Sequence, residues 1–455
     1  MTLARRLAAF AAGLRFEDIP PAVVESVRLR ALDVLGIALA ASTTEVAPSL
    51  YGALEAWGRE GGACTVVGAK RAAPAPFAAL VNGALAHGLD FDDTHAASIT
   101  HASAVVLPAV LAVGEAAGAS GRAAVTAVVA GLEAITRLGM AAPGEFHARG
   151  WHATAACGPF AAALAAGKLD GLDEARLTAG LGVAGSFASG LLEFLEDGSW
   201  VKRLHPGWAA HSGLVAAALA RGGFSGPETV LEGRFGFYRA FLGQAPDATP
   251  FETLGTAWQT LRIGFKPYPC CHYNHAYLDC ALELRRAHGL APEMIERIEC
   301  RVPAGEIPIV CEPRELKLRP RTAYEAQFSL PYGIAAALLD GGVGLETYAP
   351  ARLADPRLLA LAARVSHVVD PDSRFPEGFP GWIRLTLRDG RNLEARQPDG
   401  RGGAGRPLDP LSVVEKFRDN AGRAVAPAAL ARIERAALGI DALDDVGALM
   451  RLLHA

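Results

Sequence analysis

The feature that most constrains the fold is a change of hydrophobic periodicity near residue 265. Before it, apolar residues recur at spacings of three and four, which places them on one face of an α-helix. This spacing is found in residues 21–42, 76–90, 107–120 and 121–141. After residue 265, β-branched residues alternate with polar ones, as is typical of half-buried strands. The alternating segments are 295–303, 364–372 and 381–397.

Helical periodicity returns after residue 396, and a helical tail that follows a mixed segment packs most simply on the first domain. We therefore predict a mostly α protein with a large all-helical domain built from both chain ends, residues 1–264 and 396–455. A smaller α+β domain is predicted for residues 265–395, with a hairpin turn at Asp389-Gly390. A chain of 455 residues exceeds one ordinary domain, which agrees with this division.

Composition excludes several classes of function. The net charge is −4, and its 44 basic residues form no polybasic track, so no nucleic-acid partner is expected. The apolar runs fall short of a membrane span, and the amino terminus is predicted to be an amphipathic helix rather than a signal, so we expect no membrane association and a cytoplasmic location. The seven cysteines show no CxxC spacing, which does not support a zinc or iron–sulfur site.

A titratable cluster stands out in the apolar surroundings of residues 87–108, "HGLDFDDTHAASITHASAVVLP". If residues 82–94 are helical, His87, Asp90 and Thr94 fall on one face at spacings of three and four. The alternative is that Asp92, Asp93 and Thr94 form a solvated helix end. His101, beyond the predicted turn, favours the functional interpretation.

Two further segments of the helical part carry candidate residues. His152 stands just ahead of a long apolar helix, where the helix dipole favours an anion and a histidine could stay near neutrality; a capping or core histidine is the alternative. Lys202 is one of only six lysines beside 38 arginines (44 minus 6), and Trp200 and Trp208 flank it. A surface charge run is its alternative interpretation.

The mixed part opens with "FKPYPCCHYNHAYLDCALEL" at the predicted domain boundary, where clefts form preferentially. Lys266 and His275 lie in this segment. His272 and His275 are three residues apart, but without an acidic partner this spacing is weak support for a metal. Tyr332 lies at the start of an apolar helix, and taken alone such a position is more often a packing position than a catalytic one.

Five motifs occur in one order: "GxxxHGxDFDDTH", "GWHxTxxxGxFxAAxAAGKL", "DGxxxKRLHPGxAAxxGLxAAxLAxxGFxGPxxxLEGxxGF", "KPYPCCxxxH" and "YEAQFSLPYxIAAAL". Together they closely resemble the MmgE/PrpD family, which includes 2-methylcitrate dehydratases, cis-aconitate decarboxylases and iminodisuccinate epimerases. The similarity runs nearly end to end. It implies a helical domain from both chain ends, a smaller α+β lid, a cleft between them, and a homodimer.

The resemblance also implies the site residues and their roles. No cofactor and no metal are expected, and acid–base side chains perform the proton transfers. The catalytic residues carried over by motif are Asp90, His101, His152 and Tyr332. The residues carried over as substrate-binding are Thr94, Lys202, Lys266 and His275.

The leading hypothesis is a lyase that dehydrates or decarboxylates a small di- or tricarboxylate. Its rival is an epimerase of an iminodisuccinate-like dicarboxylate, which needs two opposed proton carriers and no leaving group. A catalytically silent scaffold that binds carboxylates or partner proteins is a third hypothesis. The pair Cys270-Cys271 differs from dedicated 2-methylcitrate dehydratases, so the substrate stays open.

Overall fold

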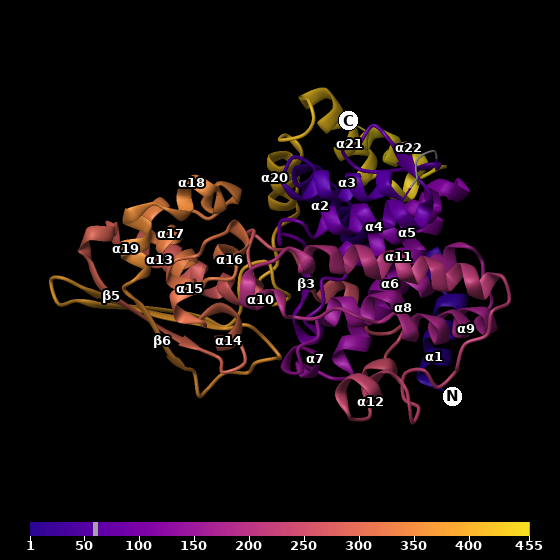
Figure 1. Cartoon of the computed structure of the whole chain (residues 1–455), viewed down its shortest axis with the longest axis horizontal. Coiled ribbons are helices and arrows are strands. Elements are labelled where there is room, and N and C mark those ends of the chain that lie inside the picture. Colours follow the sequence, from indigo (N-terminus) through magenta and orange to yellow (C-terminus); the bar gives the residue numbers. More distant parts are fainter. Residues whose placement is uncertain (58–61, 455) are drawn as a thin grey trace. The chain divides into compact units, whose positions relative to one another are not determined.

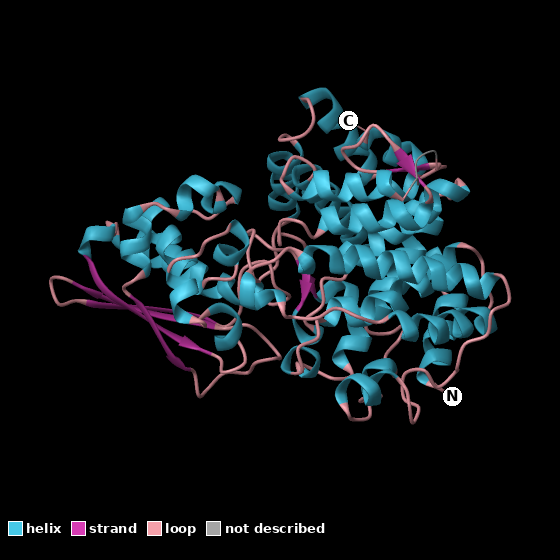
Figure 2. Cartoon of the chain, in the orientation of Figure 1, coloured by secondary structure: helices cyan, strands magenta, loops and turns pink. Residues whose placement is uncertain are grey.

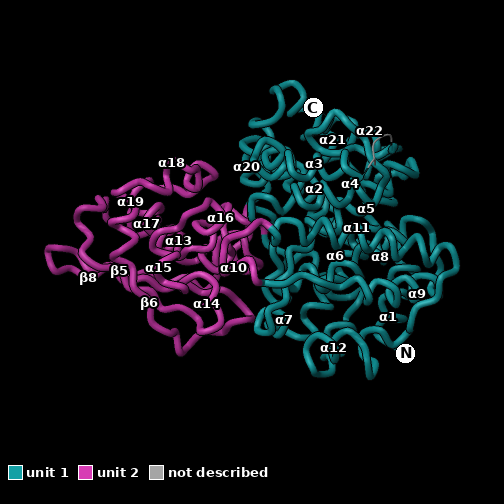
Figure 3. Tube along the Cα trace, in the orientation of Figure 1, with its two compact units in different colours: residues 1–192, 201–264, 409–455 teal, residues 193–200, 265–408 magenta. Residues whose placement is uncertain are grey.

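The computed structural model describes residues 1–57 and 62–454, and most of them are helical (Figures 1 and 2). The chain divides into two compact units (Figure 3). Unit 1 contains residues 1–192, 201–264 and 409–455, and unit 2 contains residues 193–200 and 265–408. The predicted fold class, mostly α with a smaller α+β part, is confirmed.

Unit 1 is a helical bundle whose centre is the apolar helix α8, every residue of which is buried from Ala153 to Gly167. Gly83 of α4 and Gly207 of α11 let these two helices cross closely. A Cβ on Gly207 would lie 2.0 Å from the Leu80 carbonyl oxygen of α4, and a Cβ on Gly83 would lie 2.7 Å from the Gly207 Cα. The helices of unit 1 are α1 (Leu3–Gly13), α2 (Pro21–Ala41), α3 (Val46–Ala56), α4 (Ala75–Ala86), α5 (Ser103–Ala117), α6 (Gly121–Met140), α7 (Glu145–Ala148), α8 (Ala153–Leu169), α9 (Glu174–Ala184), α11 (Val201–Arg221), α12 (Phe237–Leu242), α20 (Pro410–Ala421), α21 (Pro427–Leu438) and α22 (Gly447–Met450). Its short strands are β1 (Cys64–Thr65), β2 (Ala72–Ala73), β3 (Thr94–His95) and β4 (Ile263–Gly264).

The carboxyl-terminal helices complete unit 1, as the returning periodicity predicts. Helix α20 begins at an Asp409 cap that accepts a hydrogen bond from the Ser412 amide, and it packs along α2. In Figure 1 the yellow helices of the chain end lie beside the indigo helices of its beginning. Both chain ends therefore contribute to one core.

Helix α6 is the one helix within residues 1–57 and 62–454 that is long and apolar enough to cross a membrane. However, 89% of that apolar window is buried inside the protein. Its buried Arg137 pairs with Glu133 and donates to the Ala257 carbonyl at 2.6 Å, which ties the segment before β4 to α6. Helix α6 accordingly packs as a core helix.

Unit 2 is built on a four-stranded sheet of order β6-β5-β7-β8, in which β5 and β6 are parallel and the other pairs antiparallel. Helix α13 packs on β7 and β8, and the predicted hairpin turn is confirmed by Gly390, with φ +86° between those strands. The strands are β5 (Ile295–Val302), β6 (Val365–Val369), β7 (Gly381–Leu387) and β8 (Asn392–Gln397). The helices are α10 (Phe194–Asp197), α13 (His275–His288), α14 (Ile307–Val310), α15 (Arg314–Leu318), α16 (Ala323–Gln327), α17 (Leu330–Asp340), α18 (Pro350–Leu353) and α19 (Pro356–Ala362).

Unit 2 differs in two places from the predicted range 265–395. It runs to Leu408, because β8 continues to Gln397 and the following loop returns to α13, where the Arg401 amide donates to Asp279 at 2.7 Å. It also includes residues 193–200, which contain helix α10 and lie in the sequence between two segments of unit 1. Local periodicity shows neither feature, since both depend on contacts with distant residues.

Glu306, at the start of α14, is fully buried, and neither of its carboxylate oxygens has a hydrogen-bond partner. Burial raises its pKa well above the usual value, and nearby Asp370 adds to the effect. Above about pH 4.3 the unfolded state ionises while the folded state holds the proton, so stability falls with rising pH by about 1.4 kcal/mol per unit. We predict that Glu306→Gln raises Tm at pH 7 but not at pH 4.

Thermal unfolding followed by circular dichroism at both pH values checks this prediction. Glu293→Gln, at an exposed position in the same unit, is the matched control and should leave Tm unchanged at both. An equal Tm shift for Glu306→Gln at the two pH values would mean that ionisation is not the cause.

Candidate active site

The segment between α4 and β3 does not continue the helix, so the condition that residues 82–94 are helical is not met. Helix α4 ends at Ala86, with His87 as its cap, and Asp90 takes a left-handed conformation with φ 50°. Thr94 and His95 then form β3, which pairs with β4 far along the chain. A non-glycine residue at positive φ is strained and is held only by its surroundings, a pattern common at functional sites.

Buried charged residues stabilise the conformation of this segment. Arg30 of α2 pairs with Asp93 at 2.7 Å, with both side chains 1% exposed, and also donates to the Ile263 carbonyl of β4. Lys416 of α20 donates to the Phe91 carbonyl at 2.8 Å and pairs with Asp33 of α2 at the same distance. Residues from both the amino-terminal and the carboxyl-terminal parts of the chain therefore hold this segment in place.

Asp92 and Asp93 are buried, which overturns the alternative of a solvated helix end. Asp92 has a partner on its own segment: the Nδ1 atom of His87 lies 2.8 Å from each of its carboxylate oxygens. A carboxylate can only accept, so His87 donates through Nδ1. Asp90 forms an ion pair with Lys202 of α11, and both side chains are buried.

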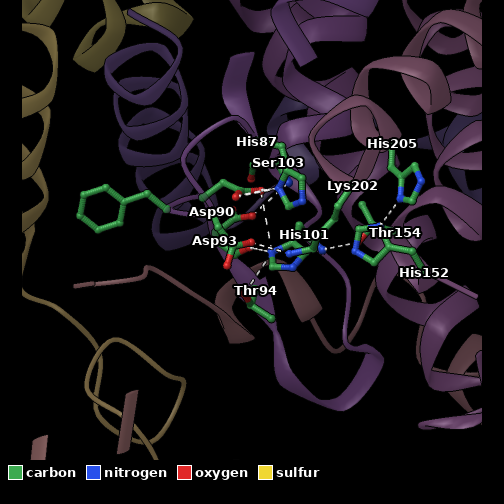
Figure 4. A network of polar contacts seen from close by, with 12 residues as sticks. His87, Asp90, Asp93, Thr94, His101, Ser103, His152, Thr154, Lys202 and His205 are labelled. Carbon is green, nitrogen blue, oxygen red and sulfur yellow. Dashed lines mark hydrogen bonds and ion pairs between the residues drawn. The ribbon is translucent and has the colours of Figure 1, made fainter. Parts of the chain in front are cut away.

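Three imidazole rings gather beside this ion pair (Figure 4). The ring centroids of His87 and His101 are 4.7 Å apart, and that of His152 lies 5.8 Å from each. His101 is oriented by the Asp93 carbonyl, 2.9 Å from its Nδ1, and by Thr94, whose hydroxyl oxygen lies 3.2 Å from the same atom.

His152 stands directly before the first residue of α8, but its side chain makes no capping hydrogen bond to that helix. Its Nδ1 atom lies 3.0 Å from Nδ1 of His205, which is three residues after Lys202 on α11. One of these two nitrogens donates and the other accepts, so the position of the proton on His152 is coupled to that on His205.

The electrostatics of the cluster favour neutral imidazoles. Burial lowers the pKa of His87, although Asp92 opposes the shift, and it lowers the pKa of His152 well below the usual value. Burial also lowers the pKa of His205 to about 3 and that of the nearby His147 to about 4. The Lys202 charge acts in the same direction on all four rings.

This arrangement combines an ammonium group with several uncharged proton acceptors in a buried place. Lys202 can attract a carboxylate, and the imidazoles can accept or return a proton. Two sets of three side chains also have potential metal-ligand atoms within 4.8 Å of one another: His87, His101 and His152, and His87, Asp90 and Asp92.

Of the eight residues predicted from the sequence, the structure brings five together in unit 1. They are Asp90, Thr94, His101, His152 and Lys202. The other three, Lys266, His275 and Tyr332, are buried in unit 2. There Nε2 of His275 lies 3.2 Å from the Cys270 carbonyl, and the Tyr332 hydroxyl donates to the Thr347 carbonyl at 2.9 Å. Burial raises the pKa of Tyr332 to about 12, so its hydroxyl keeps its proton at neutral pH.

Sequence reasoning did not assign roles to several members of the cluster. His87 and Asp92 both stand in the segment "HGLDFDDTH", residues 87–95, and a histidine five residues before a carboxylate in apolar surroundings is the signal that could have identified their pair. His205 could have been found from its spacing of three after Lys202 on a predicted helix. His147 has no comparable signal, since it lies in the short helix α7 outside any helical periodicity.

Comparisons with known proteins cover both units. Residues 5–249 match the MmgE/PrpD N-terminal domain, and residues 268–441 match the MmgE/PrpD C-terminal domain. A cis-aconitate decarboxylase of Aspergillus terreus is 29% identical over 473 residues, which is 98% of this chain and 94% of that protein. The cis-aconitate decarboxylase of Homo sapiens is 28% identical over 469 residues, 97% of this chain and 92% of its own. That of Mus musculus is 27% identical over 467 residues, with 97% and 91% covered.

Proposed function

The chain belongs to the MmgE/PrpD family, and from this premise we propose that it is a lyase acting on a small di- or tricarboxylate. The observation that carries the proposal is the buried Asp90–Lys202 ion pair beside three clustered imidazoles. The full-length similarity to proteins named cis-aconitate decarboxylase supports decarboxylation of an unsaturated tricarboxylate as the first reaction to test.

Lys202 is the proposed carboxylate-binding group, with the Thr94 hydroxyl as a second donor. A substrate carboxylate that approaches Lys202 competes with Asp90 for the same ammonium group. Because the substrate is a polyanion, its arrival also raises the proton affinity of the neighbouring imidazoles. Binding and proton uptake are coupled in this proposal.

In decarboxylation, the bond to the leaving carboxylate breaks, and its electron pair passes to the substrate carbon as carbon dioxide departs. That carbon then needs a proton, which His101 or His152 delivers in its charged form. Dehydration uses the same groups differently, because a base removes the proton α to a carboxylate and an acid protonates the departing hydroxyl. Asp90 is the proposed base once Lys202 turns to the substrate.

The roles of the residues in unit 2 are proposed from the family motifs. Lys266 and His275 are assigned to substrate carboxylates and Tyr332 to catalysis. The bond from the Tyr332 hydroxyl to the Thr347 carbonyl supports a structural contribution at least as well. Tyr332→Phe tests this directly, since it removes that bond and any proton transfer but keeps the ring.

An assay on a panel of carboxylates separates the candidate reactions. Decarboxylation releases carbon dioxide, and dehydration produces an alkene that absorbs in the ultraviolet. An epimerase exchanges the α proton with deuterium from solvent and releases neither carbon dioxide nor water. A binding scaffold turns over none of the acids but retains their binding, and that result would overturn the lyase proposal.

We expect the reaction to need no metal, because the proposed steps use only side-chain acids, bases and an ammonium group. Purified enzyme dialysed against a chelator should keep its full turnover. Turnover that is lost on dialysis and restored by one divalent metal would contradict this prediction.

The chain is further proposed to form a homodimer through unit 1. An aromatic patch, defined as Trp57, Phe77, Trp208 and His211, leaves Trp57 48% and Trp208 43% exposed. Its rings are in contact, with Phe77 and His211 centroids 5.1 Å apart and His211 and Trp208 centroids 5.3 Å apart. Contiguous exposed apolar groups of this kind mark interaction surfaces.

Light scattering at micromolar concentration should report a dimer for the wild type and a monomer for Trp208→Glu. Phe235→Glu is the matched control, since Phe235 lies outside the patch and is 84% exposed. A monomeric wild type, or a Trp208→Glu variant that stays dimeric, would place the interface elsewhere or remove it.

A further inference from the structure

We propose that His87, His101 and His152 form a binding site for a borderline divalent transition metal such as Zn²⁺, which inhibits the enzyme. The three side chains come from the end of α4, from the loop before α5 and from the start of α8. Their potential ligand atoms all lie within 4.8 Å of one another. The binding stands by itself, and only the inhibition rests on the proposed function.

Two of the donors are unsatisfied in the buried site. The Nε2 atoms of His87 and His152 are inaccessible to solvent and have no hydrogen-bond partner. Leaving a buried polar atom without a partner is unfavourable, so a cation that both nitrogens can bind is stabilised there.

Hydrogen bonds orient the donors toward metal binding. His87 donates through Nδ1 to the Asp92 carboxylate, and His101 donates through Nδ1 to the Asp93 carbonyl. Each therefore presents the lone pair of Nε2. Carboxylate and carbonyl acceptors behind ligating histidines are the partners that fix ring orientation and increase ligand basicity at zinc sites.

The distances fit tetrahedral zinc after a small adjustment. Zinc–nitrogen bonds of about 2.0–2.1 Å place ligand nitrogens about 3.3 Å apart, so each pair must close by at most about 1.5 Å. Three imidazoles and an open fourth position form a set that zinc prefers, whereas magnesium and calcium prefer oxygen ligands.

The charge of Lys202 opposes this binding, and that opposition gives the proposal a distinctive test. Its ammonium group lowers the proton affinity of His87 and His152 and repels any second cation in the same way. Removing it breaks the ion pair with Asp90, and the carboxylate of Asp90 is one of the potential ligands that converge with His87.

Calorimetric titration of the whole enzyme with ZnCl₂, in a buffer that does not bind zinc, should show one ion bound per chain. Co²⁺ should bind at the same site and show the visible bands of a tetrahedral complex. His87→Gln should abolish both signals, and His288→Gln should keep both, because His288 is an exposed histidine outside the cluster. Retention of the signals in His87→Gln would overturn the site.

Two further variants keep the test independent of folding damage. Asp92→Asn retains all three ligands and should weaken zinc binding about 10- to 100-fold through loss of the carboxylate behind His87. Lys202→Met should tighten zinc binding, a direction that general loss of structure does not produce. Unchanged or weaker binding in Lys202→Met would contradict the proposed location.

Inhibition is measured separately as turnover against carboxylate concentration with zinc present. We expect competition between zinc and the carboxylate, relieved by a chelator. If no carboxylate is turned over, the proposed function fails while the calorimetric result still decides the metal site. If turnover is normal and zinc binds without inhibiting, the regulatory part of the proposal is wrong.

Discussion

Replacement of His152 by glutamine should lower kcat about 10²- to 10⁴-fold, the usual contribution of a general acid–base group. His152 is buried at the start of α8 with one nitrogen engaged by His205 and the other facing His87 and His101. Glutamine preserves a polar side chain there but cannot accept and release a proton. Steady-state kinetics with the carboxylate identified by the panel assay measure the effect.

The split between kcat and KM distinguishes catalysis from binding in this experiment. Loss of proton transfer falls mainly on kcat, whereas loss of a uniform substrate contact falls mainly on KM. His288→Gln should change neither parameter. If His152→Gln is folded by circular dichroism and retains near wild-type kcat, His152 has no part in proton transfer.

Replacement of Arg30 by methionine should lower the free energy of unfolding by about 3–5 kcal/mol, because it leaves a buried charge without its partner. Arg30 pairs with Asp93 at 2.7 Å, and both side chains are 1% exposed. The same guanidinium group donates to the carbonyls of Thr260 and Ile263, so three partners lose a donor at once. Denaturant unfolding measures the loss.

Two companion variants identify the cause of the loss. Arg28→Met, on the same helix, breaks the more exposed pair with Asp441 and should cost only about 1 kcal/mol. Arg30→Met combined with Asp93→Asn should recover part of the stability, because the buried carboxylate is then gone. Equal losses for Arg28→Met and Arg30→Met would contradict an effect of burial.

Secondary structure was largely predictable because periodicity is a local property. The strands β5, β6, β7 and β8 lie within the segments that alternate, and helices α2, α4, α5 and α6 of unit 1 overlap the segments with spacings of three and four. The extra segment 193–200 of unit 2 was not predicted, since its membership depends on packing against distant residues such as Glu325, close to Gly198.

The residues of the candidate site were predicted from the sequence better than their arrangement was. The helix assumed over residues 82–94 would have brought His87, Asp90 and Thr94 together by spacing. In the structure they approach for another reason: Asp90 turns the chain, and Thr94 pairs with β4. Such a conformation is stabilised by Arg30 and Lys416, which lie far from it in the sequence.

The scarcity of lysine was applied to Lys202 alone, but it also points to other buried lysines. Of the six lysines, four are buried: Lys202, Lys266, Lys317 and Lys416. Lysine differs from arginine in placing a compact charge on a flexible stem, so a buried lysine in a chain rich in arginine is informative. Lys416, which contacts the Phe91 carbonyl, could have been identified by the same reasoning.

The packing of α20 on α2 has a consequence for how the protein is made. During synthesis, Asp33 emerges from the ribosome long before Lys416, its partner, and the whole of residues 265–408 must be translated between them. The apolar faces of the first helices therefore stay uncovered until a late segment of the chain has been synthesised. Contacts between residues so far apart in the sequence also form slowly. Nascent chains that stop before residue 409 should depend on chaperones, because the hydrogen bond from Lys416 to the Phe91 carbonyl cannot yet form.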